Sequence, residues 1–228
     1  MSCICIIPAR GGSKRIPRKN IKPFMGKPIM AYSIEAALMS GLFDEVMVST
    51  DDEEFAEVAR QYGASVPFLR SAETANDFAS TADVLNEVLS RYNQQGKEFD
   101  TFCCLYSTAP FVTSERLRDA YSKLSDEVDA CFTMVQYSYP VQRGLHIIED
   151  GYVAMTNPEY LQSRSQDLEP IYHDAGQFYF IKTASFHAEK TMWAKRTAPL
   201  ILSELEVQDL DTETDWKLAE MKYHLLNK

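Results

Sequence analysis

Short apolar runs alternate with helix-like segments over the first two thirds of the chain. Apolar runs of about five residues bounded by turn formers indicate buried strands, and apolar residues at a period near 3.6 indicate helices. Predicted strands cover residues 4–8, 45–50, 66–69, 99–106 and 130–137. Predicted helices cover residues 28–40, 53–62, 81–92 and 114–124. Because strands separated by helices form crossover units, we expect an α/β fold with a mostly parallel central sheet flanked by helices.

The pattern changes between about residues 138 and 172. Residues 146–155, with Asp150-Gly151 in the middle, predict a β-hairpin. Residues 157–170 are polar and irregular. We therefore expect residues 1–228 to form a single domain in which 138–172 are an excursion that covers the site, contacts a partner subunit, or does both.

The last part of the chain returns to regular structure. Residues 178–181 and 198–202 predict strands, and residues 213–226 predict a closing helix. Thr212 and Asp215 have the spacing of a capping box at the start of that helix.

Charge is distributed unevenly along the 228 residues, which carry a formal net charge of −10. No acidic residue precedes Glu35, whereas the same stretch contains seven cations: Arg10, Lys14, Arg15, Arg18, Lys19, Lys22 and Lys27. A general nucleic-acid binder usually has a broad basic face, so a small anionic ligand fits this concentration of charge better.

The apolar runs and the cysteines narrow the class of protein further. No apolar run approaches the ~18 residues of a membrane span, so no membrane partner is expected. The five cysteines lack CxxC spacing and stand in apolar, strand-like runs. They predict buried thiols rather than disulfides or zinc ligands, and hence a reducing, cytoplasmic location.

The basic residues cluster directly after the first predicted strand, where residues 6–22 read IIPARGGSKRIPRKNIK. Gly11 and Gly12 would let backbone N–H groups approach phosphate oxygens, and the neighbouring Arg and Lys side chains would neutralise them. The segment matches neither the Walker A pattern nor GxGxxG. A solvated basic loop is the alternative, but the strand and paired glycines favour a polyphosphate site.

Several motifs together resemble one enzyme family. They are IPARGGSKRIPRKNIK, the stretch from GKPIMAYSIE to SVPFLR, Thr108-Ala109-Pro110, and QDLDTETDW near the end. The chain is similar in these motifs to the CMP-nonulosonic acid cytidylyltransferases, the family of CMP-sialic acid synthetases. CCLYSTAPF and SRSQDLEPIYHDAGQFYF look closest to the pseudaminic acid branch. The resemblance implies a Rossmann-like nucleotidyltransferase fold, reaction with CTP and magnesium, and a homodimer.

The resemblance also implies roles for residues of the basic loop and beyond. It assigns Arg10, Ser13 and Lys14 to the triphosphate, beside the nucleotide-binding Gly11 and Gly12 of the backbone argument, and Lys19 to the charge on the α-phosphate or leaving group. Arg10, Lys19 and Asp211 are thus the expected catalytic residues. Asn20, Arg70 and Ser80 are expected to contact cytosine or ribose, although Ser80 is equally well placed to cap the helix that follows it.

Asp209 and Asp211 form the expected metal site. Residues i and i+2 of an extended segment project to the same side, so two carboxylates could share a Mg²⁺ ion. The alternatives are a capping role for Asp211 and a solvated surface position for Asp209. The match of QDLDTETDW to the family favours metal binding.

A nonulosonic acid carries a carboxylate, which should meet a cation. The family resemblance points to Arg164 with Gln166, and Arg143 is the second choice. Tyr106, His173 and Gln177 complete the expected sugar-binding set. Tyr106 and the His173–Gln177 segment stand where many sialic acid enzymes carry a glutamine and an Asn-Gly pair, which favours pseudaminic acid. His173 could be a general base or a hydrogen-bonded pocket residue, and no proton acceptor is assigned.

The sequence thus predicts a CTP-dependent cytidylyltransferase that activates pseudaminic acid to its CMP-sugar and releases pyrophosphate. The alternatives are a synthetase acting on N-acetylneuraminic or legionaminic acid and, in another class, a non-catalytic nucleotide-binding regulatory protein.

Overall fold

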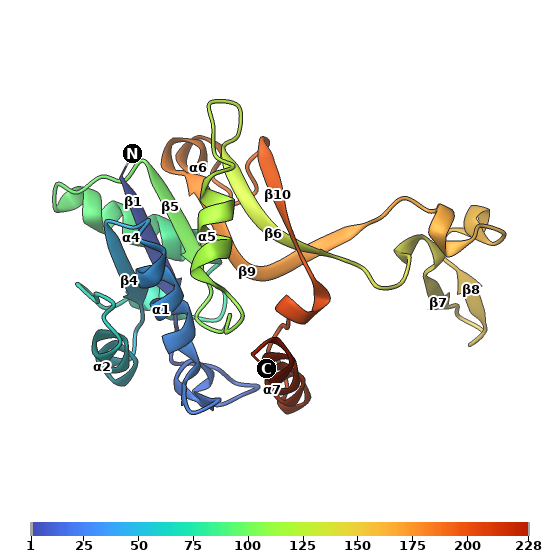
Figure 1. Ribbon diagram of the computed structural model, residues 1–228, viewed down its shortest axis with the longest axis horizontal. Helices are drawn as coiled ribbons and strands as arrows, with labels where there is room; N and C mark the ends of the chain where they lie inside the picture. The colour runs from blue at the N-terminus through green and yellow to red at the C-terminus, as the bar shows by residue number, and fades with distance from the viewer. Residues whose placement is uncertain (1, 228) are drawn as a thin grey trace.

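A six-stranded sheet forms the centre of the computed structural model, which describes residues 2–227 (Figure 1). In spatial order its strands are β10 (Thr197–Leu202), β6 (Ala130–Gln136), β9 (Tyr172–Lys182), β5 (Thr101–Leu105), β1 (Cys3–Pro8) and β4 (Glu45–Ser49). β1 pairs in parallel with β4 and β5, and β6 with β10, whereas β9 is antiparallel to both of its neighbours. The prediction of a mostly parallel α/β sheet is confirmed.

Helices cover both faces of this sheet. Successive side chains along a strand point to opposite faces, so each face has its own core. Cys5 and Ile7 of β1 point into a core shared with α1, α2 and α5, while Ile4 and Ile6 point into a second core shared with α4 and α6. The helices are α1 (Ile29–Ser40), α2 (Glu53–Gln61), α3 (Ala72–Ala75), α4 (Thr81–Gln94), α5 (Ser114–Tyr121), α6 (Thr183–Glu189) and α7 (Glu213–Leu226). No helix among residues 2–227 has the length and apolarity needed to cross a bilayer.

Several local predictions are confirmed. Thr212 and Asp215 form the expected capping box, and α7 has the predicted bounds. All five cysteines are buried and free. Burial in the core raises the pKa of Cys131 to about 11, so this thiol stays protonated near neutral pH.

The strand predicted over residues 66–69 is not formed. Ser65 alone bridges to β4: its N–H donates to Val46 O at 2.8 Å and its carbonyl accepts from Val48 N at 2.9 Å. Two residues later Pro67 has no N–H to donate, so the ladder cannot continue. The segment leaves the sheet edge and leads into the loop that carries Arg70.

The excursion, residues 137–171, projects away from the sheet between the end of β6 and the start of β9 (Figure 1). Its hairpin, β7 (Leu145–Ile147) paired with β8 (Val153–Met155), confirms the hairpin prediction. Short 3-10 turns make up much of the rest: Val141–Arg143, Pro158–Tyr160 and Ser165–Asp167. Leu145, Ile147 and Val153 are each at least 65% exposed, so this hairpin leaves its apolar side chains uncovered within one chain.

Further short elements lie beside the sheet. They are the strands β2 (Pro23–Phe24) and β3 (Lys27–Pro28) and the 3-10 turns Lys19–Ile21 and Glu204–Glu206. The first pair and α7 enclose a small third core around Phe24 and Trp216.

Candidate active site

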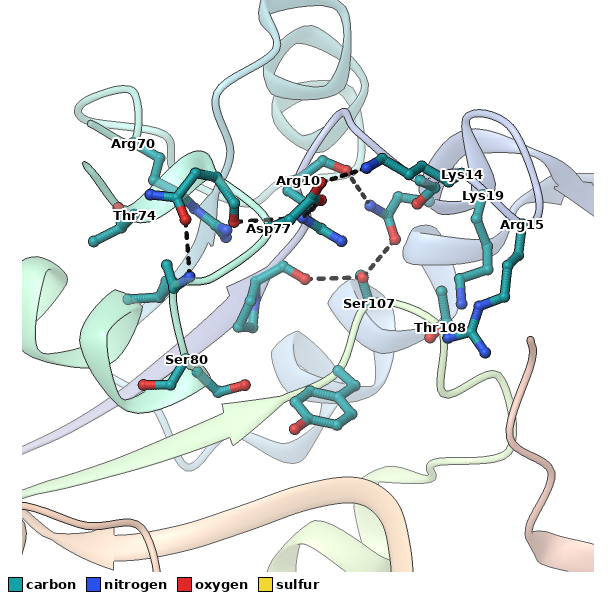
Figure 2. Close-up of a pocket in the computed structure, with 18 of the residues that line it drawn as sticks. Arg10, Lys14, Arg15, Lys19, Arg70, Thr74, Asp77, Ser80, Ser107 and Thr108 are labelled. Carbon is teal, nitrogen blue, oxygen red and sulfur yellow. Dashed lines mark hydrogen bonds and ion pairs between the residues drawn. The ribbon is translucent and has the colours of Figure 1, made fainter. Parts of the chain in front are cut away.

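A cavity of about 520 Å³ opens at the carboxyl ends of β1 and β5. Parallel strands place their following loops at one edge of the sheet, which is where α/β folds collect ligand-binding side chains. Figure 2 shows those side chains converging from the basic loop, the segment before α4 and the end of β5. The predicted residues that line it are Arg10, Ser13, Lys14, Lys19, Asn20, Arg70, Ser80 and Tyr106.

The carboxylate of Asp77 forms ion pairs with two cations on one side of the cavity. Its Oδ1 accepts from Arg10 Nη1 at 2.7 Å and its Oδ2 from Lys14 Nζ at 2.5 Å. Hydrogen bonds from Lys14 and Arg10 hold the pKa of the Asp77 carboxyl below its usual value. One carboxylate therefore spans two cations that the sequence predicted for phosphate, and sequence reasoning missed it because Asp77 lies 63 residues from Lys14.

Lys19 and Arg15 meet the acidic segment before α7. Lys19 Nζ donates to Leu210 O at 2.5 Å and lies 3.8 Å from Asp211 Oδ1, while Arg15 Nη1 pairs with Asp211 Oδ2 at 2.7 Å. Burial lowers the pKa of Lys19, and the charges of Asp211 and Asp209 partly oppose that shift. The basic loop and the predicted metal ligands are thus neighbours in space.

The two loop glycines differ from expectation. Gly11 N–H donates to Asp51 Oδ1 at 2.9 Å rather than into the cavity, and neither Gly11 nor Gly12 lines it. A Cβ on Gly11 would stand 3.1 Å from Asp52 Oδ2. In this arrangement close packing against the loop between β4 and α2 explains Gly11, and the phosphate role predicted for its amide stays a prediction.

Arg70 and Ser80 line the far end of the cavity. Arg70 is 8% exposed and donates through Nη2 to Ser49 O at 2.7 Å, which fixes its guanidinium at the wall. Burial lowers the pKa of Arg70. Ser80 Oγ accepts from Asp83 N in a capping box that starts α4. The capping role considered for Ser80 is therefore present, and its side chain also borders the cavity.

Asn20 is the buried link between the basic loop and the end of β5. Its Nδ2 donates to Arg10 O at 2.9 Å, and its Oδ1 accepts from Ser107 Oγ at 2.8 Å. Ser107 Oγ also lies 2.9 Å from Pro8 O. This network sets the course of the loop, so Asn20 positions Arg10 whatever else it contacts.

Four predicted sugar-binding residues lie outside this cavity. Arg164 belongs to the exposed excursion, where its Nε pairs with Asp167 at 2.7 Å, and Gln166 lies two residues away. Gln177 is buried and its amide donates to Glu206 O. His173 is exposed, and its ring lies tilted against that of Tyr137 at a centroid distance of 4.7 Å, beside a smaller hollow that Asp209 also lines.

The donor chemistry near Lys19 fits magnesium. Asp209 and Asp211 flank buried Leu210, and both act on the charge of Lys19. Among residues 2–227 no three His, Cys, Asp or Glu side chains converge as a metal cage. Magnesium is commonly held by one or two carboxylates together with phosphate oxygens and waters, and two carboxylates are what this segment offers.

Comparison with known proteins decides the family. A family profile described as Cytidylyltransferase matches residues 4–221. The chain belongs to the cytidylyltransferase family. It is therefore a nucleotidyltransferase, and the resemblance drawn from its motifs is confirmed.

Individual relatives agree with that assignment. A pseudaminic acid cytidylyltransferase from Campylobacter jejuni is 43% identical over 98% of this chain and 97% of its own length. A CMP-N,N'-diacetyllegionaminic acid synthase from Legionella pneumophila is 34% identical over 96% of this chain and 95% of its own. A solved CMP:2-keto-3-deoxy-manno-octonic acid synthetase complexed with CTP is 18% identical, covers 100% of this chain and 99% of its own, and superposes with a TM-score of 0.69. That likeness confirms the Rossmann-like fold.

Proposed function

We propose that this cytidylyltransferase transfers CMP from CTP to pseudaminic acid and releases pyrophosphate. The observation that carries the proposal is the cavity that gathers Arg10, Lys14, Lys19 and Arg70 at the ends of β1 and β5. The 43% identity to a pseudaminic acid cytidylyltransferase supports the choice of sugar over N-acetylneuraminic and legionaminic acid. A non-catalytic nucleotide-binding role is not favoured by these relatives.

The reaction joins the acceptor's anomeric oxygen to the α-phosphorus of CTP and breaks the bond from that phosphorus to the bridging oxygen. Pyrophosphate leaves with the bonding electron pair, and the hydroxyl proton passes to solvent or a base to which no residue is assigned. Negative charge on the phosphoryl oxygens and on the leaving group must be neutralised, so catalysis rests on positioned cations.

Nucleotide binding follows from the two ends of the cavity. Arg10, Ser13 and Lys14 would hold the triphosphate, while Arg70 and Ser80 at the other end would contact the base. Arg70 offers only donors, which suits the acceptor edge of cytosine. Its burial against Ser49 fixes those donors before the nucleotide arrives.

Lys19 would neutralise the α-phosphate or pyrophosphate, and Asp209 and Asp211 would hold Mg²⁺ next to it. When bound, magnesium supplies positive charge to the phosphate oxygens. Asp211 also pairs with Arg15 at 2.7 Å, and its remaining acceptor positions would be available to the metal.

We also propose a homodimer formed through the excursion. The exposed Leu145, Ile147 and Val153 of its hairpin support an apolar contact between two copies. Arg164 and Gln166 belong to the same excursion, so dimerisation is also the route by which they could approach an acceptor. The five buried, free thiols support a reducing compartment such as the cytoplasm.

Pyrophosphate release tests the proposal. The purified protein is supplied with pseudaminic acid, Mg²⁺ and either CTP, UTP, ATP or GTP, with EDTA as the metal control. We expect release with CTP alone among the nucleotides, and none with EDTA. Absence of release with CTP and any of pseudaminic, N-acetylneuraminic and legionaminic acid would overturn the proposed activity.

A further inference from the structure

Strand β9 carries a large irregularity beside the cavity. From Phe132 to Met134 its neighbour β6 advances by two residues, while β9 advances by five between Asp174 and Tyr179. Gly176 in this bulge has φ 63°, a conformation that residues with a side chain rarely adopt. Bulges often lie next to active sites, where they redirect a side chain.

The bulge is connected directly to the cavity wall. Tyr106 N–H donates to Gln177 O at 2.8 Å, which joins the bulge to the residue that lines the cavity. The rings of Tyr106 and Tyr179 meet edge to face at a centroid distance of 5.6 Å. Burial is the main cause that raises the pKa of both tyrosines, so both hydroxyls keep their protons near neutral pH.

Asp174 closes this group of side chains. Its Oδ2 accepts from Tyr179 Oη at 2.6 Å and its Oδ1 from Gly176 N at 2.9 Å. Asp174 is nevertheless exposed. Because a carboxylate has about four acceptor positions, roughly two remain open toward solvent, while the side chain is held in place by two hydrogen bonds.

The contacts of Tyr179 link two parts of the sequence that the sequence analysis identified separately. Tyr106 and the His173–Gln177 segment were noted as departures from the sialic acid enzymes, and Tyr179 now links Tyr106 to Asp174. An immobilised carboxylate can accept hydrogen bonds but cannot donate them. It therefore favours an acceptor that presents an N–H or O–H at this point and disfavours one that presents a carbonyl or carboxylate oxygen.

We propose that Asp174 is a specificity-determining residue for the acceptor sugar, with its carboxylate held by Tyr179 next to Tyr106 and accepting a hydrogen bond from an amide N–H or hydroxyl of that sugar. This inference rests on the proposed function and adds the chemical feature by which the sugar is selected.

The test compares Asp174→Asn with the parent enzyme and with Asp126→Asn, a control at an exposed carboxyl in the loop before β6. The kcat/KM is measured for pseudaminic, N-acetylneuraminic and legionaminic acid, together with the KM for CTP and the Tm. We expect Asp174→Asn to lower kcat/KM for pseudaminic acid by about 10- to 100-fold, the value of one hydrogen bond to a charged group. The KM for CTP should stay within about twofold, because no triphosphate or base contact is altered.

The preference for pseudaminic acid over the other two should shrink in the same variant. An unchanged preference, or an equal loss with all three acids and with CTP, would contradict the inference and leave Asp174 with a purely structural role. If Asp174→Asn does not fold, Asp174→Glu moves the charge by one methylene, and the same two outcomes decide. A parent enzyme inactive with every acid would instead defeat the proposed function itself.

Discussion

The nucleotide cavity and the excursion of residues 137–171 place their side chains by different means. In the cavity, loops that follow β1 and β5 bring Arg10, Lys19 and Tyr106 to one sheet edge, and buried Asn20 and Ser107 lock the loops together. The excursion has an exposed apolar hairpin, and its Arg164 pairs with Asp167 three residues away. The nucleotide cavity is lined by residues of one chain, whereas the hairpin of the excursion leaves its apolar side chains uncovered within one chain, and the proposed homodimer would cover them.

The largest expected effect falls on the cavity side. Asp211→Ala removes a proposed metal ligand and the partner of Arg15, so we expect turnover to fall by at least about 100-fold. Pyrophosphate release is measured across a magnesium titration, and Glu213→Ala, which alters a neighbouring carboxyl paired with Lys22, is the control. A normal rate with normal magnesium dependence in Asp211→Ala would show that the metal assignment is wrong.

A charged substitution in the hairpin of the excursion tests the proposed dimer contact. Ile147 is 76% exposed in the hairpin, and Ile147→Asp would place a carboxylate in the proposed dimer contact. We expect the dimer dissociation constant from analytical ultracentrifugation to rise by about 100-fold, while CTP binding is retained. Ile201→Asp is a matched control, because Ile201 is 52% exposed on β10. A parent protein that sediments as a monomer would refute the dimer outright.

The alkaline pH dependence probes Lys19. Burial lowers its pKa below the ordinary 10.5, so as pH rises Lys19 loses its proton before a solvated lysine would. In its proposed role Lys19 must be charged to bind the nucleotide, so kcat/KM for CTP should fall on the alkaline side at a pH below 10.5. Over that interval the unfolded chain binds the proton more tightly, so the stability cost of burying charged Lys19 is relieved as pH rises.

The Lys19→Arg variant distinguishes titration of Lys19 from titration of other groups. Arginine stays charged over the whole range, so the alkaline fall should move to higher pH even if the maximal rate is lower. Identical alkaline limbs in the parent and Lys19→Arg would assign the titration to another residue.

The smallest expected effect concerns Asp77, whose carboxylate pairs with Arg10 and Lys14 and would compete with the triphosphate proposed to bind them. Asp77→Asn should strengthen CTP binding by about twofold to fivefold at low ionic strength, in line with exposed ion pairs. Calorimetric titration with CTP at low and high salt measures this, and the gain should shrink at high salt. Weaker CTP binding in the variant would mean that Asp77 positions the cations instead of competing for them.

How far the sequence could predict the structure also differs between these regions. Apolar runs sufficed to locate the six strands of the sheet and to place the start of each predicted helix within one residue, because burial dictates both. The short helices α3 and α6 were not predicted, and α5 ends at Tyr121, three residues before its predicted end. The strand at residues 66–69 was wrong because Pro67 stops pairing at the edge, a backbone constraint that an apolar run does not reveal.

Within the site, the residues that follow a strand directly were predictable. Asp77 and Asp174 were missed because their partners, Lys14 and Tyr179, are identified only by the folded loop and the β9 bulge. Arg164 and Gln166 stay predictions, because they lie outside the cavity and would approach an acceptor only through the proposed homodimer.

A competition experiment tests the central claim most directly. The enzyme is given CTP, Mg²⁺ and equal concentrations of pseudaminic, N-acetylneuraminic and legionaminic acid, and the initial products are identified by mass spectrometry. We expect CMP-pseudaminic acid to be the predominant product, formed in equal amount to the pyrophosphate released with it. Predominant formation of either other CMP-sugar, or consumption of CTP without any CMP-sugar, would contradict the account.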